Sequence, residues 1–405
     1  MNISHFLCIR SLDITQASPF LQMAWQKIKR THPHSLLFLK DQPAMASLPP
    51  DGAIEGDVDL NAHAVKAVKR VISWSIPNER TIEDVTLLNS VEAIPGPLKA
   101  VYKLSDKRAT KTLFELFALP TPAWEILDRE FTHGALLKDN FGGKLECDLV
   151  SHMSFPLIAK PLWDCMGHGI ELIHDKRALV QTLCTNAHRN ILIESFIDGA
   201  LGCVEIIGTP GNYVFQPACY TGQSIHGVRS NFDTIRVSHP DFFKTQLNED
   251  IQSRLCNLLS HISFSGACCV DFIVKGEEIY FLEINPRISG ISCLSSAASG
   301  INSFEALYLI ASREWCKTRV SENFIKNGAV QIGGQLADDF SPLLKAEGAK
   351  ITIFRDEIIN VDGVSSRNII AGGCPETILN ILKPIDHTIL KWLRETSSAG
   401  NCINR

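Results

Sequence analysis

Residues 265–300 read SGACCVDFIVKGEEIYFLEINPRISGISCLSSAASG. Every second residue of 270–275 is apolar, Gly276 follows in a turn, and a second apolar run occupies residues 279–284. Alternation with a period of two, interrupted by a glycine turn, is typical of two paired strands. The stretch therefore predicts an antiparallel hairpin.

Polar side chains converge on this hairpin. Because successive side chains of a strand point to opposite faces, Asp271 and Glu283 can share one face, with Asn285 two residues further on. Such oxygens are costly among apolar residues unless a cation lies between them, and Mg²⁺ accepts carboxylates while leaving positions for phosphates. Arg287 is placed to neutralise a transferring phosphoryl group or an acyl phosphate. The alternative is a hairpin that carries an ordinary surface Asp and Glu.

Composition limits the function classes. The chain has 405 residues, of which 20% are charged, and a formal net charge of −5, which predicts two or three packed units and argues against nucleic acid as the main partner. The 13 cysteines include no CxxC pair, so we expect reduced thiols and no structural zinc, as in a cytoplasmic protein. The first residues do not show a basic region followed by an apolar core and a small-residue cleavage site, and no apolar stretch approaches 20 residues, so we expect neither export nor a membrane span.

The first 95 residues alternate between strand-like and helix-like patterns and predict a small α/β domain. The expected strands are residues 6–9, 35–39 and 85–88, and the expected helices are residues 21–28 and 65–71. No GxGxxG follows the first strand, so no dinucleotide site is expected. Residues 95–97, Pro-Gly-Pro, make a plausible boundary.

A helix with a cation at its start follows this boundary. Ser105 or Asp106 can cap it, and prolines 120 and 122 end it before a strand at residues 124–127. Its expected apolar face consists of Leu113, Leu116 and Phe117. Lys107 lies in the first turn, where a lysine is unfavourable for the helix dipole, so we expect a ligand that needs this charge. A solvated surface lysine is the alternative.

The next segment predicts a phosphate loop between strands at residues 155–159 and 170–173. Lys160 ends the first strand, and Gly167 and Gly169 allow the loop to direct N–H groups at phosphate oxygens. A plain hairpin connection is the alternative.

A helix at residues 177–183 and a strand at 190–193 lead to a possible nucleotide hinge. The hinge comprises Glu194, Ser195, Phe196 and Ile197, whose backbone can pair with a purine edge while Phe196 and Ile197 provide apolar walls. The alternative is a strand end followed by a turn at Asp198 and Gly199.

Further strands are expected at residues 203–208 and 213–218, followed by a loop at 222–240. This loop gathers His226, Arg229 and Arg236 as candidates for binding a substrate. Helices are expected at residues 247–261 and 303–311, on either side of the opening hairpin. A small α+β element should follow, with strands at 329–336, 349–354 and 358–361 and a helix at 388–394.

Taken in order, Lys107, Lys160, Glu194 and the group Asp271, Glu283 and Asn285 resemble the motifs of the ATP-grasp superfamily, over about residues 100–310. The EINPRISG segment is similar to carbamoyl phosphate synthetase large chains and biotin carboxylases. The resemblance implies three parts: an N-terminal α/β domain (1–95), an ATP-grasp domain of two α+β subdomains (96–312) and a small C-terminal α+β element (313–405).

The resemblance also implies the roles of the residues. Lys107, Lys160 and the loop with Gly167 and Gly169 would contact the ATP phosphates. Residues 194–197 would hold adenine, and Mg²⁺ or Mn²⁺ would bind Asp271, Glu283 and Asn285. Arg287, with Lys160, would be catalytic.

Two positions depart from the pattern. Leu201 stands where many members have a ribose-binding Glu, so Asp198 is the remaining candidate for that contact. Gly290 stands where carbamoyl phosphate synthetases place a second Arg, which makes bicarbonate a less suitable substrate than an organic acid.

The resulting hypothesis is an ATP-dependent carboxylate–amine ligase that acts through an acyl phosphate and releases ADP and phosphate. Small-molecule acids and amines, amino acids or a short peptide among them, would be its partners, and a homodimer is one option for its assembly. The alternatives are a bicarbonate-activating, carboxylase-type enzyme and a nucleotide-binding module without catalysis.

Overall fold

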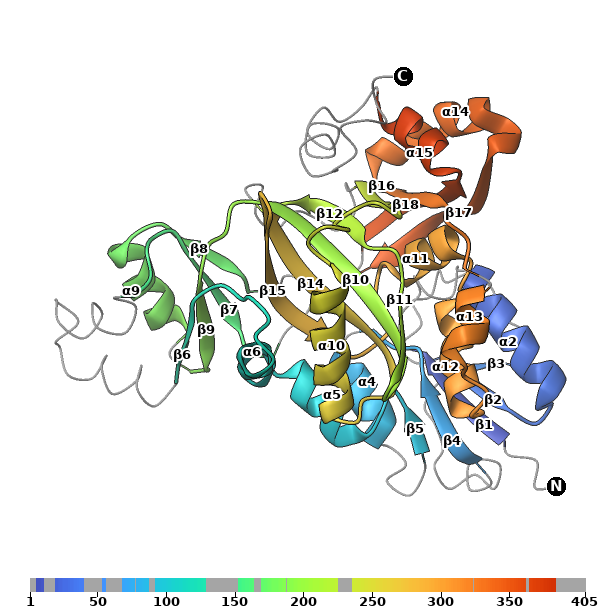
Figure 1. Cartoon of the computed structure of the whole chain (residues 1–405), viewed down its shortest axis with the longest axis horizontal. Coiled ribbons are helices and arrows are strands. Elements are labelled where there is room, and N and C mark those ends of the chain that lie inside the picture. The colour runs from blue at the N-terminus through green and yellow to red at the C-terminus, as the bar shows by residue number, and fades with distance from the viewer. Residues whose placement is uncertain are drawn as a thin grey trace.

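Three sheets organise the computed structural model of the chain (Figure 1). It describes residues 5–10, 19–39, 53–55, 68–76, 78–86, 92–128, 152–163, 169–186, 188–224, 235–322, 324–361 and 364–383. The large sheet is central, the small sheet lies at one end with helix α9, and the N-terminal sheet lies below the large one in the view of Figure 1. The mixed α/β and α+β class is as predicted.

The N-terminal sheet is parallel, in the order β3-β2-β1-β4-β5. Its strands are β1 His5–Arg10, β2 Leu36–Leu39, β3 Ala53–Glu55, β4 Val68–Ser73 and β5 Glu92–Ile94. Helices α2 (Pro19–Thr31) and α4 (Asn78–Thr86) accompany it. The α/β prediction is confirmed for strands β1 and β2 and for α2.

Two predictions in this domain were wrong. Of the segment expected as a helix at 65–71, residues 68–71 belong to strand β4, whose centre pairs with β1 and is buried, and residues 65–67 lie outside the described part of the chain. The segment expected as a strand at 85–88 begins inside helix α4, and residues 87 and 88 lie outside the described part of the chain. In both cases short apolar runs do not distinguish helix from strand, and tertiary packing decides.

The small sheet is antiparallel, in the order β6-β9-β7-β8. Its strands are β6 Trp124–Leu127, β7 Leu157–Pro161, β8 Glu171–Ile173 and β9 Ile191–Ser195. Helix α9 (Lys176–Thr185) packs on it, while α5 (Leu98–Ser105) and α6 (Lys107–Leu116) connect it to the N-terminal domain. Helix α5 was not predicted. The other elements match the prediction, except that Lys160 lies within β7 and Leu116 is 64% exposed, so that Phe114 takes its place in the core.

The large sheet has nine strands in the order β15-β14-β10-β12-β13-β16-β18-β17, and β11 also pairs with β10. Its bounds are β10 Ala200–Thr209, β11 Asn212–Phe215, β12 Cys219–Gln223, β13 Ile235–Ser238, β14 Gly266–Lys275, β15 Glu278–Asn285, β16 Gly328–Gly333, β17 Ile351–Val361 and β18 Val364–Gly373. The opening hairpin, β14–β15, is confirmed. The expected loop at 222–240 instead contains strand β13, so Arg236 lies on a strand.

Helices cover both faces of this sheet. Helices α10 (Glu249–His261), α14 (Gln335–Glu347) and α15 (Pro375–Leu382) contribute to one core with β10 and β14. Helices α11 (Ser292–Ser299) and α12 (Ser303–Ala311) pack on the other face and share a core with α2 and the N-terminal sheet. The short α13 (Lys317–Glu322) and the 3₁₀ turn η2 (Gly348–Lys350) complete the set of described helices.

The C-terminal element is not a separate layer, because β16, β17 and β18 extend the large sheet. The two strands expected at 349–354 and 358–361 form the single strand β17. Strand β18 and helices α14 and α15 were not predicted, and the helix expected at 388–394 lies outside the described residues.

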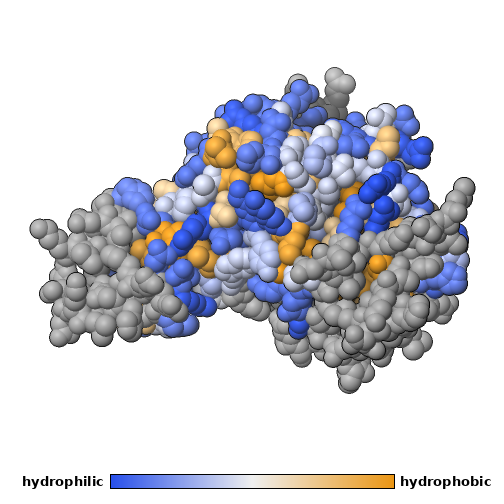
Figure 2. All heavy atoms as spheres, turned by 90° about the horizontal axis from the view of Figure 1, so that it is seen from below, coloured by the Kyte–Doolittle hydropathy of each residue, from blue (hydrophilic) through white to orange (hydrophobic). Residues whose placement is uncertain are grey.

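The surface and the thiols agree with a globular protein. On the face shown in Figure 2, hydrophobic residues are exposed in separate patches among hydrophilic ones. Among the helices that the structure describes, none is long and apolar enough to cross a membrane. The ten described cysteines are free thiols, and six of them are buried.

Candidate active site

The β14–β15 hairpin brings two carboxylates together. Asp271 is directly opposite Glu283 in the strand register, as expected from their positions in the sequence. A bulge follows this pair, because the next pairing joins Phe272 to Phe281. Gly276, at the turn, has a φ of +61°, which glycine adopts without strain. Bulges of this kind commonly redirect side chains beside functional sites.

Asn285 connects the two acids. Its Nδ2 donates hydrogen bonds of 3.0 Å to Oδ2 of Asp271 and of 3.0 Å to Oε1 of Glu283. Burial and the neighbouring charge of Glu283 raise the pKa of Asp271 to about 7. Burial also acts against ionisation of Glu283, but Lys107 and Lys160 outweigh it and hold the pKa of Glu283 at about 2. One of the two carboxylates is therefore ionised firmly and the other only weakly.

Arg287 is held in place by the N-terminal domain. Its side chain is buried, and its Nε donates a hydrogen bond of 2.7 Å to Oδ1 of Asn78, at the start of α4. Its Nη2 lies 3.4 Å from Oδ1 of Asn285, and its Nη1 donates to the carbonyl of Ile288 at 3.2 Å. The arginine thus lies directly beside the carboxylate pair.

Helix α6 brings a lysine to the same place. The Asp106 side chain caps the helix by accepting a hydrogen bond of 3.0 Å from the N–H of Ala109. Lys107, in the first turn, is buried, and its Nζ lies 3.5 Å from Oε2 of Glu283. The unfavourable position of this lysine on the helix dipole is therefore offset by a carboxylate from β15.

The end of strand β9 supplies a second ion-pair group. Oε1 of Glu194 lies 2.5 Å from Nζ of Lys160, and Oε2 lies 2.9 Å from Nζ of Lys111. Although burial favours the neutral acid, Lys111 and Lys160 keep the pKa of Glu194 below its usual range. Glu194 thus pairs with lysines in this arrangement.

Lys111 was not singled out from the sequence. It lies one helical turn after Lys107, is fully buried, and donates from Nζ to Oγ1 of Thr121 at 2.6 Å and to the carbonyl of Phe281 at 3.3 Å. Burial lowers its pKa to about 8, while Glu194 acts in the opposite direction. The spacing of four residues from Lys107 places both lysines on one helix face, and this was the available signal.

The hinge offers fewer backbone groups than expected. The N–H of Ser195 donates to the carbonyl oxygen of Ala123 at 2.9 Å. The N–H of Phe196 donates to the carbonyl oxygen of Pro156 at 3.2 Å. Ser195, Phe196 and Ile197 are half-buried, and Asp198 is exposed. Leu201, at the position of the expected ribose contact, lies on β10.

The remaining predicted residues divide into two groups. Gly169 has a φ of +68° at the entry to β8, and Arg236 is half-buried on β13. Gly167, His226 and Arg229 lie outside the described residues.

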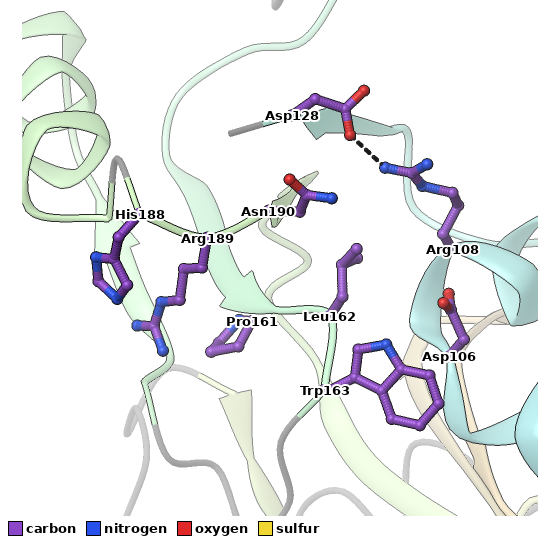
Figure 3. Close-up of a pocket in the computed structure, with 9 residues that line it drawn as sticks. All are labelled: Asp106, Arg108, Asp128, Pro161, Leu162, Trp163, His188, Arg189 and Asn190. Atoms are coloured by element: carbon purple, nitrogen blue, oxygen red, sulfur yellow. Dashed lines mark hydrogen bonds and ion pairs between the residues drawn. The ribbon is translucent and has the colours of Figure 1, made fainter. Parts of the chain in front are cut away.

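A pocket of about 660 Å³ opens beside this group. Figure 3 shows that Asp106, Arg108, Trp163 and Arg189 line it, and that Arg108 is paired with Asp128, at a distance of 2.6 Å. Asp106 and Pro161, which also lines the pocket, are the chain neighbours of Lys107 and Lys160. The pocket therefore adjoins the lysines rather than enclosing them.

The assembled site has an excess of cationic side chains. Four cationic groups, Lys107, Lys111, Lys160 and Arg287, lie in one buried region with the carboxylates Glu194, Asp271 and Glu283. These residues come from α6, β7, β9 and the β14–β15 hairpin, and Asn78 adds a contact from α4. Clustered ammonium and guanidinium groups bind phosphates, and paired carboxylates bind a divalent cation.

This geometry agrees with the comparisons with known proteins. Residues 145–314 match the family model of the carbamoyl-phosphate synthase L chain, ATP binding domain. The match covers 170 of the 405 residues and makes this segment similar to that ATP-binding domain. The chain is 25% identical over 233 residues to a carbamoyl-phosphate synthase of Methanobrevibacter smithii, a match that covers 57% of the chain and 58% of that relative. The chain thus matches little more than half the length of this relative.

Solved structures of ATP-grasp proteins have the same fold over nearly the whole chain. The L-amino acid ligase from Bacillus licheniformis superimposes with a TM-score of 0.64 at 16% identity, covering 94% of this chain and 96% of that one. The biotin carboxylase domain of 2-oxoglutarate carboxylase from Hydrogenobacter thermophilus, solved with magnesium ADP and bicarbonate, gives 0.66 at 13% identity, covering 92% and 86%. At these identities the ATP-grasp likeness concerns the fold.

Proposed function

We propose that this ATP-grasp protein is an ATP-dependent carboxylate–amine ligase that works through an acyl phosphate. The observation that carries the proposal is the contact of Lys107 with Glu283, 3.5 Å apart, in the same buried region as the Lys160–Glu194 pair. Groups far apart in the sequence thereby form one site that combines cations for phosphates with carboxylates for a metal. A surface hairpin and a solvated lysine would not be brought together in this way.

ATP would bind with its phosphates against Lys107 and Lys160 and the loop that ends at Gly169. Adenine would lie at the hinge that begins at Glu194. Because the N–H groups of Ser195 and Phe196 are already bonded, we expect the base to use the N–H of Ile197 or the hinge carbonyls. Asp198 is exposed and remains the candidate for a ribose contact.

The carboxylates fit a magnesium or manganese ion. The amide nitrogen of Asn285 donates to both Asp271 and Glu283, at the place where burial and the charge of Glu283 raise the pKa of Asp271 and where a cation would offset them. Oδ1 of Asn285 accepts hydrogen bonds from Asn78 and Arg287, so this amide would have to rotate to act as a ligand. When bound, the ion would supply charge neutralisation on the phosphates.

The reaction needs positioning and charge neutralisation rather than a nucleophilic side chain. A substrate carboxylate oxygen attacks the γ-phosphorus of ATP, the bond to the β-phosphate oxygen breaks, and ADP leaves. The amine then attacks the acyl carbon, phosphate leaves, and a proton is released from nitrogen. Lys160 would hold the transferring phosphoryl group, and Arg287, fixed by Asn78, would neutralise charge on the acyl phosphate.

A panel assay tests the proposal. ADP and phosphate release would be measured with L-amino acids and short peptides in all pairs, with bicarbonate alone as a separate arm. The ligase proposal predicts ADP release that requires both an acid and an amine and yields an amide. Turnover with bicarbonate alone would instead indicate a carboxylase-type enzyme, and tight ATP binding without turnover by any pair would indicate a nucleotide-binding module.

A further inference from the structure

Two arginines share one face of the large sheet. Arg236 on β13 is opposite Gln331 on β16, Gln331 is opposite Ile370 on β18, and Ile370 is opposite Arg355 on β17. Directly opposed residues of antiparallel strands project to the same side. The row therefore directs Arg236 and Arg355 to the face on which α11 packs.

Arg236 reaches the loop that follows the metal-site hairpin. Its Nη1 lies 3.0 Å from the position that a Cβ on residue 290 would occupy. Gly290 is three residues after Arg287, so the guanidinium of Arg236 adjoins the segment that carries the proposed catalytic arginine. A side chain at 290 would press against this guanidinium, whereas glycine leaves it room.

Arg355 is the more deeply placed member of the pair. It is 3% exposed, and its Nη2 donates to Oδ1 of Asn368, which also accepts from Nε2 of Gln331 at 3.4 Å. Burial lowers the pKa of Arg355, the charges of Cys293 and Glu357 raise it, and the charge of Arg236 lowers it. The positive charge of Arg236 therefore acts on Arg355 from within the same row of the sheet.

The start of helix α11 lies at the same place. Gly290 precedes the helix by two residues, and Cys293, in its first turn, is among the groups whose charge acts on Arg355. The partial positive charge at a helix N-terminus adds to that of the two arginines. Two guanidinium groups that share a largely buried face are stabilised best by an anion, and a carboxylate matches the planar donors of arginine.

We propose that Arg236 and Arg355 bind a carboxylate that is not phosphorylated in the reaction, so that one substrate carries a second carboxylate as a recognition group. This inference rests on the proposed ligase function and names its substrate class. The carboxylate that reacts must lie at Arg287 and the Asp271–Glu283 pair, beside the γ-phosphate. The arginine pair, which Arg236 places beside Gly290, serves the free carboxylate of an amino acid that acts as the amine, or a second carboxylate on the acid.

Matched substrates distinguish these two sources. ADP release would be compared for L-alanine and L-alaninamide as the amine, and for succinate and succinamate as the acid, each with the full set of partners. We expect loss of the recognised carboxylate to lower kcat/KM roughly tenfold or more, mainly through KM. If L-alanine and L-alaninamide are used equally well, and succinate and succinamate are also used equally well, the inference is wrong while the ligase function remains intact.

Two variants act on the pair without removing the buried Arg355. Arg236→Gln removes the half-buried charge, and Gly290→Ala pushes the guanidinium of Arg236 aside without changing any charge. Both should raise KM for the carboxylate substrate and reduce its preference over the amide, with a smaller effect on kcat. Arg367→Gln is the matched control, because Arg367 lies on β18 and pairs with Asp338 and Asp356 on the opposite face.

A binding measurement decides the matter even if no pair gives turnover. Titration calorimetry with L-alanine and with succinate, in the presence of magnesium and a non-hydrolysable ATP analogue, should show binding of one of them. We expect binding to weaken roughly tenfold in Arg236→Gln and to be unchanged in Arg367→Gln. Binding of neither ligand, or equal binding by wild type and Arg236→Gln, contradicts the proposed site.

Discussion

Oδ1 of Asn78 accepts a hydrogen bond of 2.7 Å from Nε of Arg287, although 209 residues separate them in sequence. Nδ2 of Asn78 also donates to Oδ1 of Asn285 at 3.2 Å. A single residue of the N-terminal α/β domain thus contacts the last residue of β15 and the arginine that lies two residues after it. Through this residue the N-terminal domain contributes to the site, whether or not the domain binds a ligand itself.

Substitution Asn78→Ala should therefore impair the site more than the fold. Without its acceptor, the guanidinium of Arg287 loses a charged hydrogen bond worth about 1.5–3 kcal/mol, which corresponds to a fall of roughly 10- to 100-fold in kcat. ATP binding should change less, because the side-chain hydrogen bonds of Asn78 go to Arg287 and Asn285 rather than to the lysines. Steady-state ADP release and nucleotide titration would measure the two effects separately.

Glu79→Ala is the control for this prediction, because Glu79 follows Asn78 on the same helix and is half-buried. We expect it to retain wild-type kcat. If Asn78→Ala also retains wild-type kcat at the same Tm, Asn78 has no positioning role.

The local elements were largely readable from the sequence. The alternation in β14 and β15 fixes the Asp271–Glu283 pairing, and Asp106 marks the start of α6 by its capping chemistry. In contrast, the contact of Asn78 with Arg287 has no local pattern, since it depends on how two domains pack. The same holds for the row from Arg236 to Arg355, which exists only because β16, β17 and β18 join the large sheet.

Glu283→Gln should abolish turnover while leaving a folded protein. The substitution keeps the size of the side chain but removes the charge that pairs with Lys107, and with it the more firmly ionised of the two carboxylates that we propose as ligands of a divalent ion. We expect ADP release to fall at least roughly 100-fold at saturating magnesium. Titration of magnesium in the presence of ADP would show the weakened metal dependence.

Glu278→Gln is the matched control, because Glu278 is on the same strand and is exposed. It should leave the magnesium dependence unchanged. A Glu283→Gln variant with the magnesium dependence of the wild type would exclude Glu283 as a metal ligand.

Lys111→Met should reduce the stability of the fold. Lys111 is fully buried, and its loss leaves the buried carboxylate of Glu194 with Lys160 as its remaining lysine partner. Breaking a buried ion pair on one side typically costs about 3–5 kcal/mol. Urea denaturation would measure the loss in the free energy of unfolding, with Lys103→Met, at an exposed position on α5, as the control. If Lys111→Met lowers the free energy of unfolding by less than Lys103→Met does, Lys111 contributes no net stability.

Glu205 gives the fold a dependence on pH. This carboxyl is fully buried on β10 and accepts hydrogen bonds from Ser292 of α11 and, at 2.6 Å, from Ser303 of α12. Burial raises its pKa from 4.5 to about 7, although these hydroxyls and Gln216 act in the opposite direction. Between these values the folded protein holds a proton that the unfolded chain releases. The stability from Glu205 is therefore complete below pH 4.5 and is lost as the pH rises through 7.

Glu205→Gln should remove this dependence, because the amide is neutral at every pH. At about 1.4 kcal/mol for each pKa unit, the free energy of unfolding of the wild type should fall relative to the variant by about 3 kcal/mol between pH 4.5 and pH 8. Urea denaturation of the wild type and of Glu205→Gln at several pH values would measure this difference. The contributions of the other titrating groups cancel, because both proteins contain them. Parallel curves for the two proteins would show that Glu205 is already ionised in the folded state at pH 4.5 and above, and that the hydroxyls of α11 and α12 stabilise the charge.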